Sequence, residues 1–142
     1  MPGIPADAHI GRVRLRVSDL ERSLELYRDV LGFEIAGRAH GLAALATPDD
    51  GEDAGAELIV LEERPGIRRR PSRPITTGLY HVALLLPSRA ALGAMMHQFN
   101  RSAYPLRGAS DHGVSESLYL DDPDGNGLEI YADRPRERWP RR

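Results

Sequence analysis

The chain has 142 residues, a formal net charge of −2 and no cysteine. This length suits one domain that buries its own core, and the lack of cysteine excludes disulfide bonds, thiolate metal sites and cysteine nucleophiles. The charge balance provides no overall basic field for nucleic acid, residues 1–8 lack the apolar core of a signal peptide, and the longest apolar run, 82–87, is too short to cross a membrane. A cytoplasmic protein is therefore expected.

The first half of the chain predicts one strand, one helix and three further strands. Apolar and polar residues alternate over 10–17, which is typical of a half-buried strand. Ser18 and Glu21 have the spacing of a helix capping box, and Gly32 suits a left-handed helix end. Three short strands are predicted at 33–38, 42–46 and 56–62, with an acidic, glycine-rich turn at 49–55.

The same order is predicted again after a connection rich in proline and arginine. A strand at 78–86 precedes Ser88, which is positioned as a helix N-cap, and an apolar stripe at helical spacing begins at Leu92. Three more strands are predicted at 105–109, 115–120 and 127–132, and the turn between the last two reads D-D-P-D-G-N-G.

Strand, helix and three strands thus occur twice in one domain, with little sequence identity between the halves. We expect a first βαβββ unit at 10–63, a linker at 64–77, a second unit at 78–132 and a tail at 133–142. Because neither half has enough apolar surface to be stable alone, the two should pack as a pair, either within one chain or exchanged between two.

Three segments, at 12–33, 78–87 and 110–131, carry a family resemblance. The first contains V-S-D-L and L-G-F, the second H-V-A-L-L-L-P and the third D-P-D-G-N-G-L-E-I-Y. With these motifs the chain resembles the glyoxalase/bleomycin-resistance/extradiol-dioxygenase superfamily, also called the vicinal oxygen chelate superfamily. The last two segments most resemble the catechol-2,3-dioxygenase-like branch, where they match the first half of longer proteins. The resemblance implies an α+β fold in which two βαβββ units form a curved mixed sheet.

The resemblance also implies a metal site inside the cup of that sheet. In the dioxygenases of this superfamily, two histidines and a carboxylate hold Fe(II) or Mn(II) and leave positions open for a diol and oxygen. Aligning the second unit places two ligands at His81 and Glu129. The side chains of His81 and Glu129 lie on the opposite strand face from the apolar residues next to them, so both are expected to point into the cup. The alternative is that they are a surface pair at a sheet edge.

The third ligand position falls on Arg12, which has no lone pair to give to a metal. His9 lies three residues upstream with the opposite parity and is a weaker candidate. Arg12 instead suggests a charge-assisted pair with Glu129. With Arg14 and Arg16 on the same face, the cup would then favour an anionic ligand. The alternative is that these arginines face solvent along an amphipathic strand.

Further candidates follow from the resemblance. Tyr119 occupies the place of a tyrosine that helps to hold the substrate hydroxyl, and His112 lies in a loop like one that closes over substrate. A histidine titrates near neutrality, so His112 suits an acid or base, although a plain loop residue is the alternative. Tyr131 is a further candidate for the cup, whereas His97 and His40 are expected to be structural or exposed.

Three functions remain open at this point. The first is a metal-dependent extradiol dioxygenase, or a related glyoxalase-type isomerase or lyase, with an aromatic diol as substrate. The second is a metal-free protein of the bleomycin-resistance type that sequesters an anionic ligand in an arginine-lined cup. The third is a subunit whose missing ligand comes from another chain. A homodimer is expected for this fold, whereas the third reading pairs the chain with a different one. No nucleic-acid or membrane partner is expected.

Overall fold

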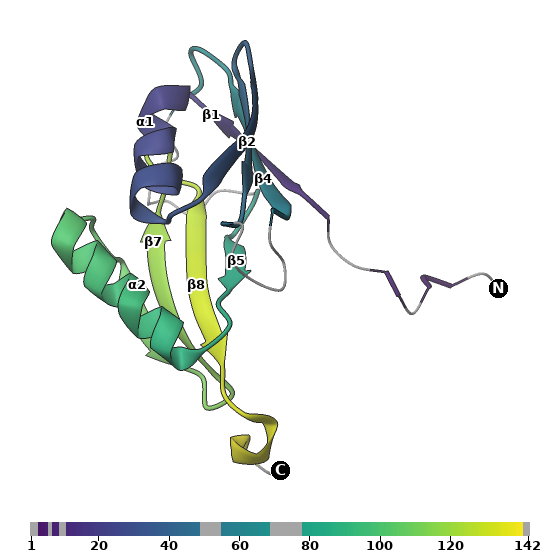
Figure 1. Cartoon of the computed structure of the whole chain (residues 1–142), viewed down its shortest axis with the longest axis vertical. Coiled ribbons are helices and arrows are strands. Elements are labelled where there is room, and N and C mark those ends of the chain that lie inside the picture. The colour runs from purple at the N-terminus through teal and green to yellow at the C-terminus, as the bar shows by residue number, and fades with distance from the viewer. Residues whose placement is uncertain (1–2, 6, 9–10, 49–54, 69–77, 141–142) are drawn as a thin grey trace.

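The computed structural model describes residues 3–5, 7–8, 11–48, 55–68 and 78–140 (Figure 1). The elements in chain order are β1 (Val13–Val17), α1 (Leu20–Leu24), the π-helix η1 (Glu25–Val30), β2 (Glu34–Ala39), β3 (Leu42–Ala46), β4 (Glu57–Glu63), β5 (Val82–Leu85), α2 (Arg89–Ser102), β6 (Gly108–Asp111), β7 (Ser115–Asp121), β8 (Gly127–Asp133) and the 3-10 helix η2 (Arg136–Arg138). Among the described helices, none combines the length and the apolar character needed to cross a bilayer.

These elements confirm the predicted α+β fold of two βαβββ units. The described strands form two four-stranded mixed sheets, ordered β1-β4-β3-β2 and β5-β8-β7-β6. In each sheet the first strand of the unit pairs in parallel with the last, and the other neighbours are antiparallel. The two units therefore have the same topology despite their different sequences.

The first helix begins differently from the predicted capping box. Asp19 is the N-cap, and its Oδ1 accepts a hydrogen bond of 3.0 Å from the backbone N–H of Arg22. Ser18 donates its hydroxyl to Asp124 instead, and Glu21 pairs with Arg38. The predicted box at Ser18 and Glu21 was wrong because both side chains find partners outside the helix.

The continuous helix expected after the cap is divided into α1 and the π-helix η1. The backbone N–H of Leu31 bonds the carbonyl of Leu26 at 2.8 Å, which is the spacing of a π-turn. The wider turn lets adjacent Leu26 and Tyr27 both be buried. Gly32, with a φ of +83°, ends the helix in the left-handed conformation that was predicted.

The second unit follows its predicted pattern with two shifts at strand ends. Ser88 is the N-cap of α2, as expected, because its Oγ accepts a hydrogen bond from Ala91 N. Strand β5 begins at Val82 instead of 78, since its partner β8 pairs with it only from Leu128 onwards. Strand β6 begins at Gly108 instead of 105, since Pro105 has no N–H to donate to a ladder.

The two units share one hydrophobic core. Figure 1 shows α1 and α2 on the same side of the strands, and α2 packs on β7 and β8 while also contacting η1. The largest fully buried side chains come from both halves and include Tyr27, Leu61, Phe99, Leu120 and Ile130. The halves therefore pack as a pair within the chain. Residues 49–54 of the predicted turn and 69–77 of the linker lie outside the described residues.

The turn between β7 and β8 connects the units by polar contacts. Asp124 is only 5% exposed and accepts hydrogen bonds from the first unit: 2.9 Å from Ser18 N, 2.6 Å from Ser18 Oγ and 3.0 Å from Arg22. Each of these donors would lose a partner if the units separated. Asp124 therefore fixes the beginning of the first helix against the second sheet.

Asp122, in the same turn, is 1% exposed. It accepts hydrogen bonds from the Tyr27 hydroxyl at 3.1 Å, from Asp124 N at 2.9 Å, and from Asn126 N and Nδ2, both at 2.8 Å. Burial raises its pKa although these hydrogen bonds favour the charged form. The turn is thus a buried junction between the units.

We expect Asp124→Ala to lower the free energy of unfolding by about 2–3 kcal/mol, because partly buried donors on Ser18 and Arg22 lose their acceptor. Asp29→Ala is the control, since Asp29 pairs with neighbouring Arg28 at the surface and should contribute no more than about 0.5 kcal/mol. Urea unfolding followed by circular dichroism measures both. Equal stability of the two variants would contradict the role of Asp124.

Candidate functional site

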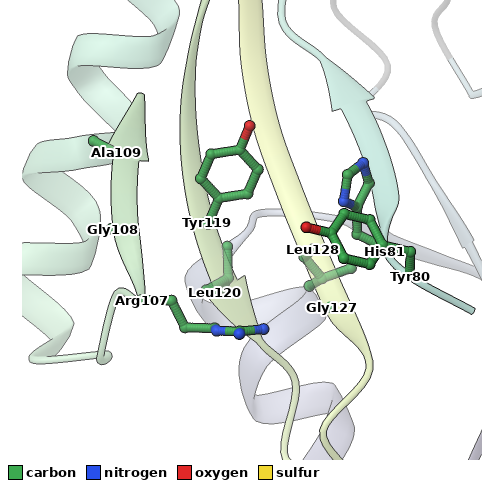
Figure 2. Close-up of a pocket in the computed structure, with 9 residues that line it drawn as sticks. All are labelled: Tyr80, His81, Arg107, Gly108, Ala109, Tyr119, Leu120, Gly127 and Leu128. Atoms are coloured by element: carbon green, nitrogen blue, oxygen red, sulfur yellow. The ribbon is translucent and has the colours of Figure 1, made fainter. Parts of the chain in front are cut away.

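The second sheet carries a cavity of about 290 Å³ (Figure 2). Its wall contains the rings of Tyr80, His81 and Tyr119, the side chain of Arg107, and the backbone around Gly127. The Tyr80 and His81 rings lie 4.8 Å apart between centroids, and those of His81 and Tyr119 lie 6.2 Å apart. The cavity therefore presents aromatic surface beside polar groups.

Four of the residues expected from the sequence form one hydrogen-bonded chain at this cavity. His81 Nε2 lies 2.9 Å from Glu129 Oε2, and the Tyr119 hydroxyl donates to Glu129 Oε1 at 2.8 Å. His112 Nε2 lies 2.8 Å from the same hydroxyl. Because β7 and β8 pair Tyr119 directly with Glu129, the sheet register sets this contact.

The chain of contacts also assigns the protons. The Tyr119 hydroxyl has a single hydrogen, which it gives to Glu129, so His112 Nε2 must be the donor to the Tyr119 oxygen. An ionised Glu129 can only accept, so His81 Nε2 carries the hydrogen between them. Each histidine therefore has its Nε2 protonated in this arrangement.

The pKa shifts agree with that assignment. Burial opposes the charge of Glu129, but the nearby Ser117 and Tyr119 hydroxyls and the two histidines outweigh it, so that the pKa of Glu129 lies below its usual value. Burial and the hydrogen bond to Glu129 raise the pKa of Tyr119. At neutral pH the site therefore holds a carboxylate and a protonated phenol.

His81 and Glu129 have the donor atoms that divalent iron or manganese prefers, and they point at one place. A three-ligand centre needs one more donor. Within the ranges that the structure describes, no group of three or more histidine, aspartate or glutamate side chains is placed to hold a metal. His9 lies outside the described residues. The described part of the chain therefore offers a metal two donors, His81 and Glu129, and no third.

Arg12 does not pair with Glu129. Its guanidinium pairs with Glu57, and that of Arg14 lies 3.8 Å from Glu62. Neither arginine lines the cavity. The reason is that the two units form separate sheets, so Glu129 lies in a different sheet from β1. Because β1 pairs with β4, the carboxylates that meet these arginines belong to the first unit.

Comparison of the two parallel ladders explains the missing donor. The ladders begin at Val13–Ile59 in the first unit and at Val82–Leu128 in the second. Arg12 therefore corresponds to His81, and Val60 corresponds to Glu129. The first unit thus replaces both donors of the second unit, one by a cation and one by an apolar side chain.

The remaining candidates lie away from the cavity. Tyr131 shares a strand face with Glu129, and burial together with the charges of Asp133 and Glu129 raises its pKa, but it does not line the cavity. His40 is exposed in a turn and His97 is exposed on α2, as expected.

Sequence reasoning named only His81 and Tyr119 of the cavity wall, and the residues that it missed include Tyr80, Arg107 and Gly127. Tyr80 is 87% exposed at the wall, and Arg107 lies just before β6. A Cβ on Gly127 would lie 2.5 Å from the Tyr80 carbonyl oxygen and 3.2 Å from the His81 Cβ. A glycine at the start of a strand signals such close approach, and this signal was available from the sequence.

Comparisons with known proteins show the family of the chain. Residues 9–130 match the Glyoxalase/Bleomycin resistance protein/Dioxygenase superfamily. The chain is 44% identical over 141 residues to a catechol-2,3-dioxygenase of Bacillus subtilis, covering 99% of this chain and 47% of that protein. It is 29% identical to biphenyl-2,3-diol 1,2-dioxygenase 3 of Rhodococcus globerulus, covering 84% of this chain and 60% of that one. The chain thus spans about half the length of these relatives.

Solved structures share the fold at lower identity. A glyoxalase/dioxygenase from Nostoc punctiforme has a TM-score of 0.76 and 18% identity, covering 95% of this chain and 99% of that one. Lactoylglutathione lyase from Agrobacterium tumefaciens has a TM-score of 0.67 and 22% identity, covering 90% and 96%. Identities this low show the fold alone.

We expect Gly127→Ala to cost about 2–3 kcal/mol of unfolding free energy, because the added methyl group collides with the backbone that carries His81. Gly93→Ala is the control: Gly93 lies in α2 with open space around it, so alanine should stabilise the helix by about 0.5–1 kcal/mol. Urea unfolding measures both, and a neutral Gly127→Ala would contradict the close packing of β8 against residues 80–81.

Proposed function

Since the chain belongs to the glyoxalase/bleomycin resistance protein/dioxygenase superfamily, we propose that it takes part in extradiol-type ring cleavage of a catechol-type diol bound in the cavity beside Glu129. The observation that carries this proposal is the His112–Tyr119–Glu129–His81 chain at an aromatic wall. The 44% identity to a catechol-2,3-dioxygenase supports it.

The residues of the cavity suit the two parts of such a substrate. The rings of Tyr80 and Tyr119 offer faces and edges against which a flat aromatic ring packs. The carboxylate of Glu129 accepts a hydrogen bond from a diol hydroxyl, and Tyr119 holds that carboxylate in position. The exposed His112 lies at the solvent end of the chain of contacts, where it can take up or return a proton.

Fe(II) or Mn(II), when bound, would act as a Lewis acid and stabilise the negative charge that develops on the diol oxygens. His81 and Glu129 are the residues that would hold it, and His81 Nε2 would have to give up the proton it shares with Glu129. We propose that the third donor comes from beyond the described side chains, from another chain such as a second copy in a homodimer.

One observation favours a second candidate, a metal-free protein that binds a ligand without converting it. Arg12 and Val60 occupy the positions in the first unit that correspond to His81 and Glu129. A site with only two protein donors holds a metal weakly, whereas the hydrogen-bonded cavity needs no metal to bind a small aromatic molecule.

Metal content and oxygen consumption separate these candidates. The chain would first be loaded anaerobically with Fe(II) or Mn(II). The first candidate then predicts about one metal per chain, as a three-ligand centre would hold, and oxygen uptake with catechol. His81→Ala and Glu129→Ala should abolish both, whereas His97→Ala on the surface of α2 should change neither. Catechol binding without metal or oxygen uptake would support the second candidate instead.

Tyr119→Phe tests the hydrogen-bonded chain separately from metal binding. The variant keeps the ring but loses the hydroxyl that connects Glu129 to His112, so ring cleavage should slow about 100-fold while metal content is unchanged. Tyr131→Phe, on the same strand face but outside the cavity wall, should retain full activity. A fully active Tyr119→Phe would exclude Tyr119 from the reaction.

A further inference from the structure

The cavity wall contains a permanent positive charge that the hydrogen-bonded chain does not use. Arg107 lines the cavity together with Tyr80, His81 and Tyr119. Its backbone N–H donates to the Tyr119 carbonyl at 2.7 Å, so Arg107, just before β6, lies beside Tyr119 of β7. In Figure 2 the Arg107 guanidinium lies below the Leu120 side chain, on the side of Tyr119 that is away from the Tyr119 hydroxyl.

The Arg107 guanidinium has donors left for a ligand. Within the described part of the chain it donates one hydrogen bond, to Asp121 Oδ1 at 3.1 Å, and its side chain is 59% exposed. A guanidinium has five N–H donors in a planar fork that matches a carboxylate. A ligand carboxylate can therefore pair with Arg107 while Asp121 stays in contact.

Among the described arginines, only Arg107 lines this cavity. Arg12 and Arg14 have carboxylate partners in the first sheet and are not part of the cavity wall. An anion in the cavity would meet Arg107 in the wall, while the Glu129 carboxylate lies next to the wall residues His81 and Tyr119, which it contacts. Because Glu129 repels an anion, the anionic group of a ligand must lie at the Arg107 end.

We propose that the cavity selects aromatic diols that carry a carboxylate on the ring, with the diol beside Glu129, the ring between Tyr80 and Tyr119, and the carboxylate on Arg107. This inference rests on the proposed function, because that function places the diol. The cavity volume of about 290 Å³ is near the lower limit for small-molecule sites, about 300 Å³, and suits a single substituted ring.

The test compares two probes, 3,4-dihydroxybenzoate and catechol, by anaerobic titration calorimetry on the full chain, so that binding is measured without turnover. A charge-assisted pair that is partly exposed to solvent should make 3,4-dihydroxybenzoate bind about fivefold more tightly than catechol. Arg107→Gln should remove this preference, so that the two probes bind with equal affinity. Arg107→Lys should keep part of it, because lysine retains the charge without the planar fork.

Arg12→Gln and Arg101→Gln are the matched controls, since both remove an exposed arginine outside the cavity wall. They should leave the preference unchanged. Three outcomes would overturn this inference and leave the proposed function standing. The native chain could bind both probes with equal affinity, Arg107→Gln could retain the preference, or Arg12→Gln could remove it. If neither probe bound, the inference and the proposed diol site would fail together.

Discussion

The structure depends on the buried aspartates of the turn between β7 and β8. Asp122 and Asp124 are almost fully buried, and each accepts hydrogen bonds from the first unit, from Tyr27 or from Ser18 and Arg22. Burying a carboxylate without hydrogen-bond partners raises the free energy of the folded state. The turn is therefore held at the position against the first helix where both aspartates keep their donors. This constraint places the start of β8 and, through it, the site.

The site then follows from the pairing of strands within the second sheet. Gly127 lets the backbone at Tyr80 approach β8 closely, which brings His81 beside Glu129. The antiparallel pairing of β7 with β8 puts Tyr119 directly opposite Glu129. Two neighbouring ladders thus assemble one chain of contacts from residues that are up to 48 positions apart, from His81 to Glu129.

The two units have the same topology but differ in chemistry. The first unit has Arg12 and Val60 where the second has His81 and Glu129, and Arg12 pairs within its own sheet. At these matched positions of the described residues, the histidine and the carboxylate, whose side chains carry the donor atoms suited to a metal, are therefore both in the second unit.

Much of the fold was predictable from the sequence, because alternation, helical spacing and Gly32 are local signals that depend on neighbouring residues. The parity of His81, Tyr119 and Glu129 likewise followed from alternation, and the family resemblance named them. The partners of Arg12 and Ser18 were not predictable, since an ionic or hydrogen-bonding side chain pairs with whatever the packing brings near it. The division into two sheets, the buried turn at Asp122 and the place of Arg107 in the cavity wall arise from long-range packing, and only the tertiary structure decided them.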